Sequence, residues 1–227
     1  MTDVLERGEM EDEVSVMANL DHENLMGMER FFYCGEDTIS LVMEYVPVDL
    51  YRFICREDDI PRERVASYMF QLLSGLAYLH SKNTVHGDLH VENVLVDAET
   101  DRIKICDFGW ARENRKGEEH FPVSRRIFGN DIWSAASIFV EMAIRHRAFC
   151  PIKVPWEKEG VDRIKKNLGI AKREEGDASM DTRAGMVRRR LLKEKVGEAG
   201  LDLLSKMMEH DPRKRISASS ALKHPFF

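Results

Sequence analysis

A short stretch near the middle of the chain, His86 to Asn93 (HGDLHVEN), concentrates residues that can do chemistry. It holds two histidines, an aspartate, a glutamate and an asparagine. Two kinds of site fit these residue types. One is a metal centre on His86 and His90. The other is a loop that transfers a phosphoryl group, with the carboxylate of Asp88 as the base.

The zinc interpretation needs His86 and His90 on one face of a helix, because side chains four positions apart meet there. Gly87 and the β-rich sequence VENVLV after it disfavour a helix at this place. The stretch also lacks the HExxH pattern of many zinc enzymes. Zinc is therefore the minor alternative.

Residues downstream of the stretch favour phosphoryl transfer. Asp88 precedes Asn93 by five positions (93 − 88), and Asp107-Phe108-Gly109 comes after a short segment. The reaction needs one carboxylate to accept the proton of the substrate hydroxyl. It also needs an amide and a second carboxylate to hold Mg²⁺ on the phosphates. DFG alone is a weak signal, but HGDLHVEN followed by VLV and IKICDFG is a strong one.

The elements that must position these residues can be predicted from apolar periodicity and turn residues. Apolar runs at 94–96 and 103–105 predict a short hairpin between the loop and DFG, and DIWSAASIFVEMAI (131–144) predicts a buried helix. The other expected elements are a helix at 5–20, a hairpin from 30–34 and 38–46, a helix with Pro61 in its first turn, a charged insert at about 157–200, an amphipathic helix ended by Pro212 and a helix capped by Ser217.

The composition is that of an ordinary globular protein: 43% of the 227 residues are hydrophobic and 33% are charged. The net charge of −6 argues against a nucleic-acid partner, and no apolar run is long enough to span a membrane. The four cysteines, Cys34, Cys55, Cys106 and Cys150, form no CxxC pair and are expected to be reduced. With an acidic N-terminus and no apolar signal segment, these features predict an intracellular protein, cytoplasmic or nuclear.

Further stretches carry a resemblance to eukaryotic protein kinases. ANLDHENLMGMERFFYCGEDTISLVMEYVPVDLYRFI resembles the kinase segment from the regulatory helix through the hinge. DIWSAASIFVEM resembles the helix that supports the catalytic loop, and LLSKMMEHDPRKRISASSALKHPFF is similar to the end of the kinase domain. The wording is nearest to the cyclin-dependent Ser/Thr kinases, over about residues 9–150 and 196–227.

The resemblance implies an α+β, protein-kinase-like fold. Residues 1–46 would form a reduced N-lobe, of one helix and a β-hairpin, with the hinge. Residues 47–227 would form a mostly helical C-lobe that carries the charged insert. ATP and Mg²⁺ are the implied cofactors, and a protein substrate or protein partner is implied. A cyclin-like regulator is not implied, because the residues aligned with the family's partner-reading helix are EMEDE.

The resemblance also assigns roles to single positions. Asp88 would be the catalytic base, and Asn93 and Asp107 the magnesium ligands. Backbone groups of Glu44 and Val46 would face adenine. The remaining candidates are Leu95 as the floor of the nucleotide pocket, Asp49 toward the ribose, Glu13 as the acid of the regulatory helix, and His86, His90, Asp131 and Arg215 in supporting positions.

Several positions depart from the family pattern. The 227 residues contain no glycine-rich phosphate loop and no lysine strand ahead of Glu13. Gly87 replaces an arginine that reads a phosphorylated activation segment, and His90 replaces a lysine that steadies the transferred phosphate. Asp131 follows Asp107 by only 24 positions (131 − 107), and no APE sequence lies between them.

Two functions therefore stay open. One is a cyclin-dependent-kinase-like Ser/Thr kinase, with a cell-cycle role by family resemblance. Its turnover would be slow, because each missing charge stabiliser costs about 10²–10³ in rate. The other is a pseudokinase that acts as a scaffold or as a nucleotide-binding regulator. In either case Arg215, which would pair with the APE glutamate, is expected to be unpaired or to have a new partner.

Overall fold

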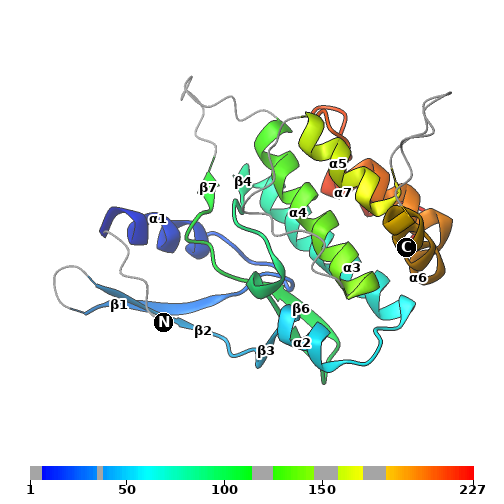
Figure 1. Cartoon of the computed structure of the whole chain (residues 1–227). Coiled ribbons are helices and arrows are strands. Elements are labelled where there is room, and N and C mark those ends of the chain that lie inside the picture. Colours follow the sequence, from blue (N-terminus) through cyan, green and yellow to red (C-terminus); the bar gives the residue numbers. More distant parts are fainter. Residues whose placement is uncertain (1–6, 35–37, 114–124, 146–157, 171–182) are drawn as a thin grey trace.

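The structure is a computed structural model that describes residues 7–34, 38–113, 125–145, 158–170 and 183–227. Its elements are α1 (Arg7–Ala18), β1 (Met28–Tyr33), β2 (Ile39–Met43), β3 (Val48–Asp49), α2 (Leu50–Arg56), α3 (Arg62–Ser81), β4 (Thr84–Val85), the 3₁₀ helix η1 (Val91–Asn93), β5 (Val94–Asp97), β6 (Arg102–Ile105), β7 (Arg112–Glu113), α4 (Arg125–Ile144), α5 (Lys158–Leu168), α6 (Arg183–Met207) and α7 (Ala218–Ala221). Figure 1 shows α1 and the β1–β2 hairpin on one side and the large helices on the other. The predicted α+β class is confirmed.

The N-terminal hairpin was predicted and is confirmed. β1 and β2 are antiparallel, with Phe31 opposite Leu41 and Tyr33 opposite Ile39. Every residue of β1 after Met28 is exposed, whereas β2 is half-buried up to Met43, and Met28 and Leu41 pack against the core. Two strands gain little stability by themselves, and the hairpin therefore depends on its attachment to the rest of the chain.

That attachment is a set of hydrogen bonds between the segment before β1 and strand β6. The Met26 amide donates to the Ile105 carbonyl (2.8 Å), and the Ile105 amide donates to the Asn24 carbonyl (2.9 Å). The buried side-chain amide of Asn24 also donates to the Ile103 carbonyl (3.1 Å). Breaking such buried bonds leaves polar groups unsatisfied, so they fix the N-terminal part on the helical part.

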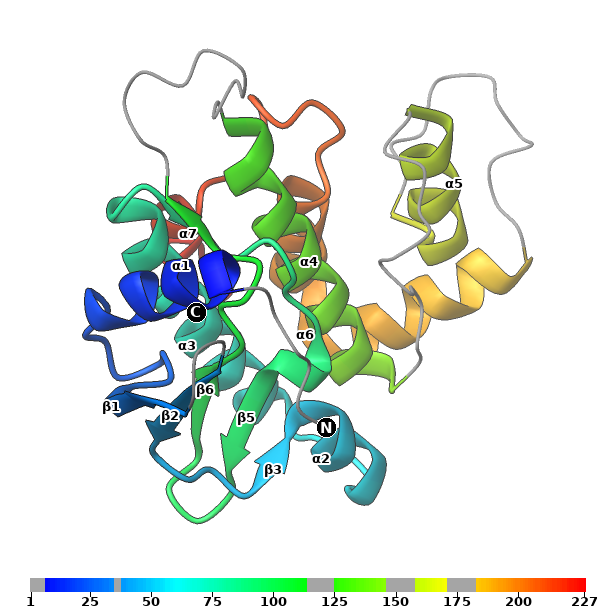
Figure 2. The ribbon, with the colours of Figure 1, turned by 90° about the vertical axis from the view of Figure 1, so that its left-hand side faces the viewer.

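Three strands form a second sheet in the order β3-β5-β6, side by side in Figure 2. β5 and β6 are the predicted hairpin, with Val94 opposite Ile105. β3 adds Asp49 opposite Leu95. β4 pairs with β7 as a separate two-stranded sheet. Strands of two residues leave no sequence pattern, and neither β3, β4 nor β7 was predicted. Together the two sheets frame residues 86–93.

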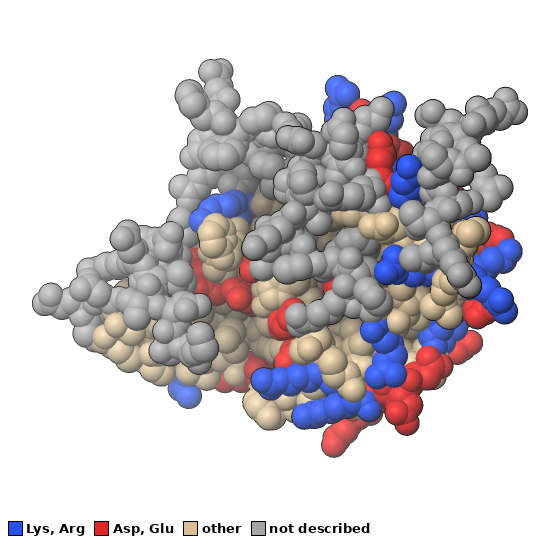
Figure 3. Space-filling model, viewed as in Figure 1, with Lys and Arg blue, Asp and Glu red and all other residues tan. Residues whose placement is uncertain are grey.

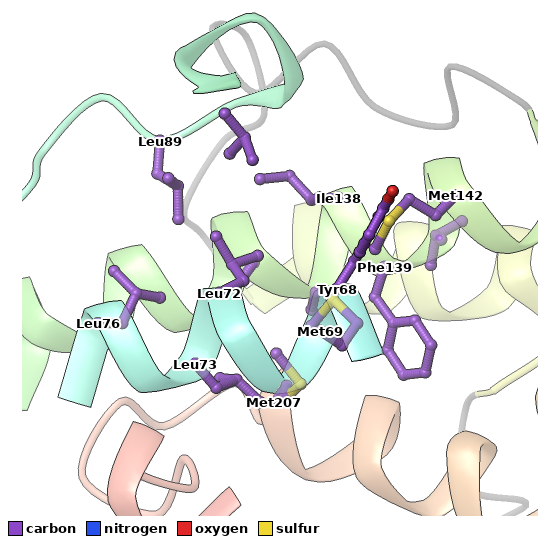
Figure 4. Close-up of a cluster of buried hydrophobic side chains, with 14 of the residues drawn as sticks. Tyr68, Met69, Leu72, Leu73, Leu76, Leu89, Ile138, Phe139, Met142 and Met207 are labelled. Atoms are coloured by element: carbon purple, nitrogen blue, oxygen red, sulfur yellow. The ribbon is translucent and has the colours of Figure 1, made fainter. Parts of the chain in front are cut away.

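The core lies between α3, α4 and α6. Along α3 the predicted apolar stripe is buried, and Figure 4 shows its side chains, such as Leu72, facing Ile138 and Phe139 of α4 and Met207 of α6. Leu89 of the candidate loop reaches into the same cluster. Burying one such side chain contributes roughly 1.5–3 kcal/mol, so Leu89 ties the loop firmly to the core.

The charged insert contains α5 and the first part of α6 within the described residues. Its charged side chains pair with one another, for example Arg190 with Glu194 (2.8 Å) and Lys193 with Glu198 (2.6 Å). Blue and red residues are accordingly mixed over the right-hand side of Figure 3. α6 is kinked at Gly197, whose φ of +70° lies in the left-handed region that favours glycine. The described residues of the insert are helical, but they are only partly solvated, because Leu168, Leu192 and Val196 are buried in the core.

Some boundaries differ from the prediction. Helix α2 was not predicted, and Asp49 begins it as N-cap by accepting the Arg52 amide (2.7 Å). Pro61 is the N-cap of α3 rather than a residue of its first turn, and its carbonyl accepts the Val65 amide (3.0 Å). The helix expected to run to Pro212 ends at Met207. The Ser217 cap is confirmed, because its hydroxyl accepts the Ser220 amide (3.2 Å). Among the described helices, none could cross a membrane.

Candidate active site

The carboxylate of Asp131 anchors the start of the loop of residues 86–93. The Asp131 carboxylate accepts hydrogen bonds from the backbone amides of His86 (3.0 Å) and Gly87 (3.1 Å) and from Nε2 of His80 (2.9 Å). Asp131 is only 2% exposed. A buried carboxylate with three donors fixes the start of the loop, since losing any of them would leave a buried group unsatisfied.

His86 connects this loop to the DFG segment. Its Nε2 donates to the Cys106 carbonyl (3.0 Å), and its Nδ1 accepts the Asp88 amide (3.3 Å). The ring also packs against Phe108, with centroids 5.5 Å apart. Both ring nitrogens are thus used inside the protein, which rules His86 out as a zinc ligand in this arrangement. Among the described residues, no group of three or more His, Cys, Asp or Glu could hold a metal ion.

Asn93 joins the same two segments at the other end of the loop. Its side-chain NH₂ donates to the Asp88 carbonyl (2.9 Å), and its carbonyl accepts the Cys106 amide (3.0 Å). This leaves Oδ1 of the buried Asn93 side chain as the remaining acceptor. Asp107 is the residue directly after Cys106, and its φ of +64° is unusual for a residue other than glycine. The structure therefore brings together the three residues predicted to act on the phosphates.

The side chain of Asp88 faces His90. Nε2 of His90 is 3.5 Å from Oδ2 of Asp88, and Nδ1 of the same ring is hydrogen-bonded to Oε2 of Glu92 (3.0 Å). The Asp88 side chain is 42% exposed, so it is open to a substrate. Sequence reasoning singled out Asp88 and His90 but gave Glu92 no role, and the signal that could have found it is its spacing of two from His90.

Glu13 of α1 reaches the DFG segment. Oε2 of Glu13 and Oδ1 of Asp107 both approach the α-carbon of Gly109, because a Cβ placed there would lie 4.0 Å and 3.4 Å from them. Desolvation by burial, followed by the negative charge of Asp107, raises the pKa of Glu13, while a hydrogen bond with the backbone of Phe108 opposes this. Glu13 of α1 thus lies against the DFG segment.

The predicted hinge residues lie between β2 and β3. The Glu44 side chain is used structurally: Oε1 accepts the Gly27 amide (3.0 Å) and pairs with Nζ of Lys104 (2.8 Å). Its backbone, like that of half-buried Val46, is the part assigned to adenine. Leu95 on β5 is half-buried and lies between Asp49 of β3 and Lys104 of β6 in the sheet. The ion pair between Lys104 and Glu44 was not predicted, because the two residues are sixty positions apart in the sequence (104 − 44).

Asp49, predicted to face the ribose, is occupied locally. Its carboxylate caps α2 and pairs with Arg52 (3.2 Å).

The negative charge of Asp49 also acts on the thiol of Cys106. Burial, then Asp107, then Asp49 raise the pKa of the Cys106 thiol to about 12. Cys106 is therefore protonated and unreactive at neutral pH. Cys34, Cys55 and Cys106 are free thiols, as expected, and Cys150 lies outside the described residues.

Gly87 is required by the backbone of this loop. Its φ is +83°, and a Cβ at this position would lie 2.8 Å from the carbonyl oxygen of Trp110. Any other residue would strain the loop or push away the chain after DFG. The backbone of Trp110 closes over Gly87, while its side chain is 66% exposed.

Arg215 has new partners. Its Nε donates to the Glu209 carbonyl (2.9 Å), and its guanidinium lies over the Trp133 ring, 5.4 Å from the centroid. Burial lowers the pKa of Arg215 to about 10 despite the charges of Glu209 and Asp211. Arg215 is therefore not unpaired. Trp133 is fully buried, as predicted.

The comparisons with known proteins agree with this geometry. Residues 2–227 match the family described as protein kinase domain. The chain belongs to the protein kinase family. It is also 30% identical, over 250 residues, to "Protein kinase gsk3" of Schizosaccharomyces pombe. That match covers 95% of this chain and 63% of the relative, so the chain spans less than two thirds of the relative's length.

Proposed function

We propose that the protein is a Ser/Thr protein kinase, which transfers the γ-phosphoryl group of ATP to a protein hydroxyl. The observation that carries the proposal is the hydrogen-bonded arrangement of Asp88, Asn93 and the DFG segment around His86. Phosphoryl transfer depends mainly on positioning and charge neutralisation. A loop anchored by Asp131 and by buried Leu89 suits the first requirement.

The donor set fits Mg²⁺. The ion prefers hard oxygen ligands, and Asn93 offers an amide oxygen while Asp107 offers a carboxylate. The side-chain NH₂ of Asn93 is bound to the Asp88 carbonyl, which orients Oδ1 away from that bond. ATP would supply the phosphoryl group. Asp88, with its partly exposed carboxylate, would accept the proton of the substrate hydroxyl.

For the nucleotide base, the proposed contacts are the backbone groups of Glu44 and Val46 and the side chain of Leu95. The ion pair of Glu44 with Lys104 supports this assignment, because it holds the hinge backbone in place without using its peptide groups. A ribose contact by Asp49 would compete with its role as the cap of α2 and its pair with Arg52. Asp49 is therefore a weaker candidate than the hinge backbone.

A pseudokinase, acting as scaffold or nucleotide-binding regulator, is the second candidate function. It is favoured by Glu13, which bonds the DFG backbone instead of a lysine, and by His90 in place of the catalytic-loop lysine. Kinases turn over at roughly 1–100 s⁻¹. Replacing the catalytic-loop lysine by His90 removes one charge stabiliser, which is worth about 10²–10³ in rate, and would leave slow transfer.

The finer assignments are proposals of the same kind. The motif wording favours the cyclin-dependent type and a role in the cell cycle, whereas the Schizosaccharomyces pombe relative is named gsk3. A protein substrate is common to both assignments. The Glu13 segment supports no particular cyclin-like partner, since Glu13 contacts the chain's own DFG segment.

Transfer of labelled γ-phosphate by the purified chain tests the proposal. We expect Mg²⁺-dependent labelling of a protein substrate that Asp88→Asn abolishes and the surface change Asp162→Asn leaves intact. Equal background labelling by the unaltered chain and by Asp88→Asn would reject the kinase and leave the pseudokinase. A thermal shift with ATP and Mg²⁺, compared in Asn93→Ala, then separates a nucleotide-binding regulator from a scaffold.

A further inference from the structure

A hollow of about 400 Å³ lies beside α7, the short helix that packs against α3. Its wall includes His80 of α3, Ile132 of α4 and part of the segment from Pro212 to Ser220. None of the described residues that line it belongs to the loop 86–93 or to the DFG segment. We propose that this hollow binds a phosphate monoester, at a site separate from the candidate active site. The inference does not rest on the proposed kinase function.

The hollow carries basic side chains. Arg213, Lys214 and Arg215 follow one another in the sequence, and all three line the hollow. No acidic residue is among the described residues of its lining, although the chain as a whole has a net charge of −6. A concave surface lined by one sign of charge concentrates ions of the opposite sign. The hollow therefore attracts anions.

Two of these cations are held in place before any ligand arrives. Nε and Nη2 of Arg213 donate to the two carboxylate oxygens of Asp211, each at 3.0 Å. Nε of Arg215 donates to the Glu209 carbonyl (2.9 Å), and the guanidinium lies over the Trp133 ring. Groups that are already oriented lose little freedom on binding, and the planar guanidinium is well suited to phosphate oxygens.

A serine at α7 adds a neutral donor. The hydroxyl of Ser217 donates to the hydroxyl oxygen of Ser220 (2.9 Å). A hydroxyl has one proton and two acceptor positions, so Ser220 keeps its own proton for a further acceptor. Both serines line the hollow, and Ser220 is exposed. The hollow thus combines a hydroxyl donor with three cations.

This set of donors fits a phosphate monoester better than a carboxylate. A phosphate monoester carries a charge of about −1.5 to −2 and three strong acceptor oxygens, whereas a carboxylate carries one charge on two oxygens. The volume is also larger than a phosphate group needs, and it lies in the range of small-molecule sites. The group that bears the phosphate therefore has room to enter. That group is a small molecule or a phosphorylated serine of a partner protein, and the experiment distinguishes these sources.

Calorimetric titration of the full chain at constant ionic strength tests the site. The probes are inorganic phosphate, a short acetylated peptide with phosphoserine at its centre, and the same peptide without phosphate. We expect binding of a phosphorylated probe and none of the unphosphorylated peptide. Lys214→Ala and Arg213→Gln should each weaken binding by roughly 3-fold to 30-fold, because each removes an exposed cation.

The chain offers a matched control for each variant. Lys223→Ala removes an exposed lysine outside the lining of the hollow. Arg190→Gln removes an exposed arginine that, like Arg213, is paired with an acid. Both controls should bind the probe as the unaltered chain does. Because the replaced side chains are exposed, all four variants should also keep the Tm of the unaltered chain within a few degrees.

Amide resonances in a ¹⁵N-labelled chain show where the probe binds. We expect the largest changes at residues 213–220, and smaller ones in the loop 86–93. Ser220→Ala should weaken binding less than Lys214→Ala does, because it removes a neutral donor. Ser219→Ala is the matched control, since Ser219 is exposed but does not line the hollow.

Each outcome bears on the proposal. Tighter binding of the phosphoserine peptide than of inorganic phosphate would support the site and assign the phosphate to a partner protein. Equal binding of the two would support a site that recognises the phosphate group alone, as in a small molecule. If neither probe binds, if Lys214→Ala and Lys223→Ala bind equally well, or if the largest amide changes lie elsewhere, the proposal is overturned. The kinase function is decided separately, by the transfer of labelled γ-phosphate.

Discussion

Replacing Asp131 by asparagine should destabilise the whole protein, because this residue holds the start of the catalytic loop. Oδ2 of Asp131 accepts from His86 and His80, and Oδ1 accepts from Gly87. Asparagine keeps the shape but turns one acceptor into an NH₂ group. In its better orientation that group meets the Gly87 amide, so two donors face each other.

The magnitude can be worked out from these bonds. Leaving a buried donor unsatisfied costs about 1–3 kcal/mol, and the two retained bonds weaken because they lose the charge of the carboxylate. We therefore expect Asp131→Asn to lower the free energy of unfolding by about 2–4 kcal/mol. At roughly 2–4 °C per kcal/mol for a chain of this length, Tm should fall by about 4–16 °C.

Urea and thermal unfolding followed by circular dichroism would measure this change. Asp162→Asn, the same substitution at an exposed position of α5, is the matched control and should stay within about 0.5 kcal/mol of the unaltered chain. If Asp131→Asn were as stable as this control, the three hydrogen bonds would not hold the loop, and the reasoning would be refuted.

Three further predictions concern single residues. Gly87→Ala should cost about 1–3 kcal/mol of unfolding free energy, because alanine disfavours its φ of +83°. Gly27→Ala, whose Cβ would make only an ordinary contact with Oε1 of Glu44 (3.5 Å), should cost less; equal losses in urea unfolding would contradict this. Burial keeps the pKa of Cys106 at about 12, so at pH 8 its thiolate fraction is about 10³ lower than that of an ordinary thiol. Iodoacetamide should therefore modify exposed Cys34 and spare Cys106 in the folded chain, which mass spectrometry can verify, and equal modification of both would count against the buried thiol. Ser217→Ala should remove the cap of α7 and cost about 1 kcal/mol, seen as a drop in Tm; an unchanged Tm would show that the cap is dispensable.

Much of the fold could be predicted because its signals are local. The apolar stripe of α3, the hairpins and the Ser217 cap each arise from residues a few positions apart, and they form as expected. Helix α2 escaped prediction because its apolar residues form too short a run, and its start depends on Asp49, which was assigned to another role. Strands β3, β4 and β7 escaped because a two-residue strand exists only through its partner.

The candidate site likewise has one part that the sequence predicts and another that depends on the tertiary structure. The types and spacing of Asp88, Asn93 and Asp107 are properties of the sequence, and by themselves they indicate phosphoryl transfer. The spacing of two between His90 and Glu92 is the sequence signal for their contact, but whether the two side chains meet depends on the backbone at the start of η1.

The sequence by itself thus determined the residue types and spacing of the loop 86–93 and its order relative to DFG. Only the tertiary structure decided which contacts these residues make. Gly87 proved necessary because its backbone lies against the Trp110 carbonyl, and the guanidinium of Arg215 lies over the Trp133 ring. Such contacts join residues far apart in the chain, and their partners are set by packing rather than by spacing.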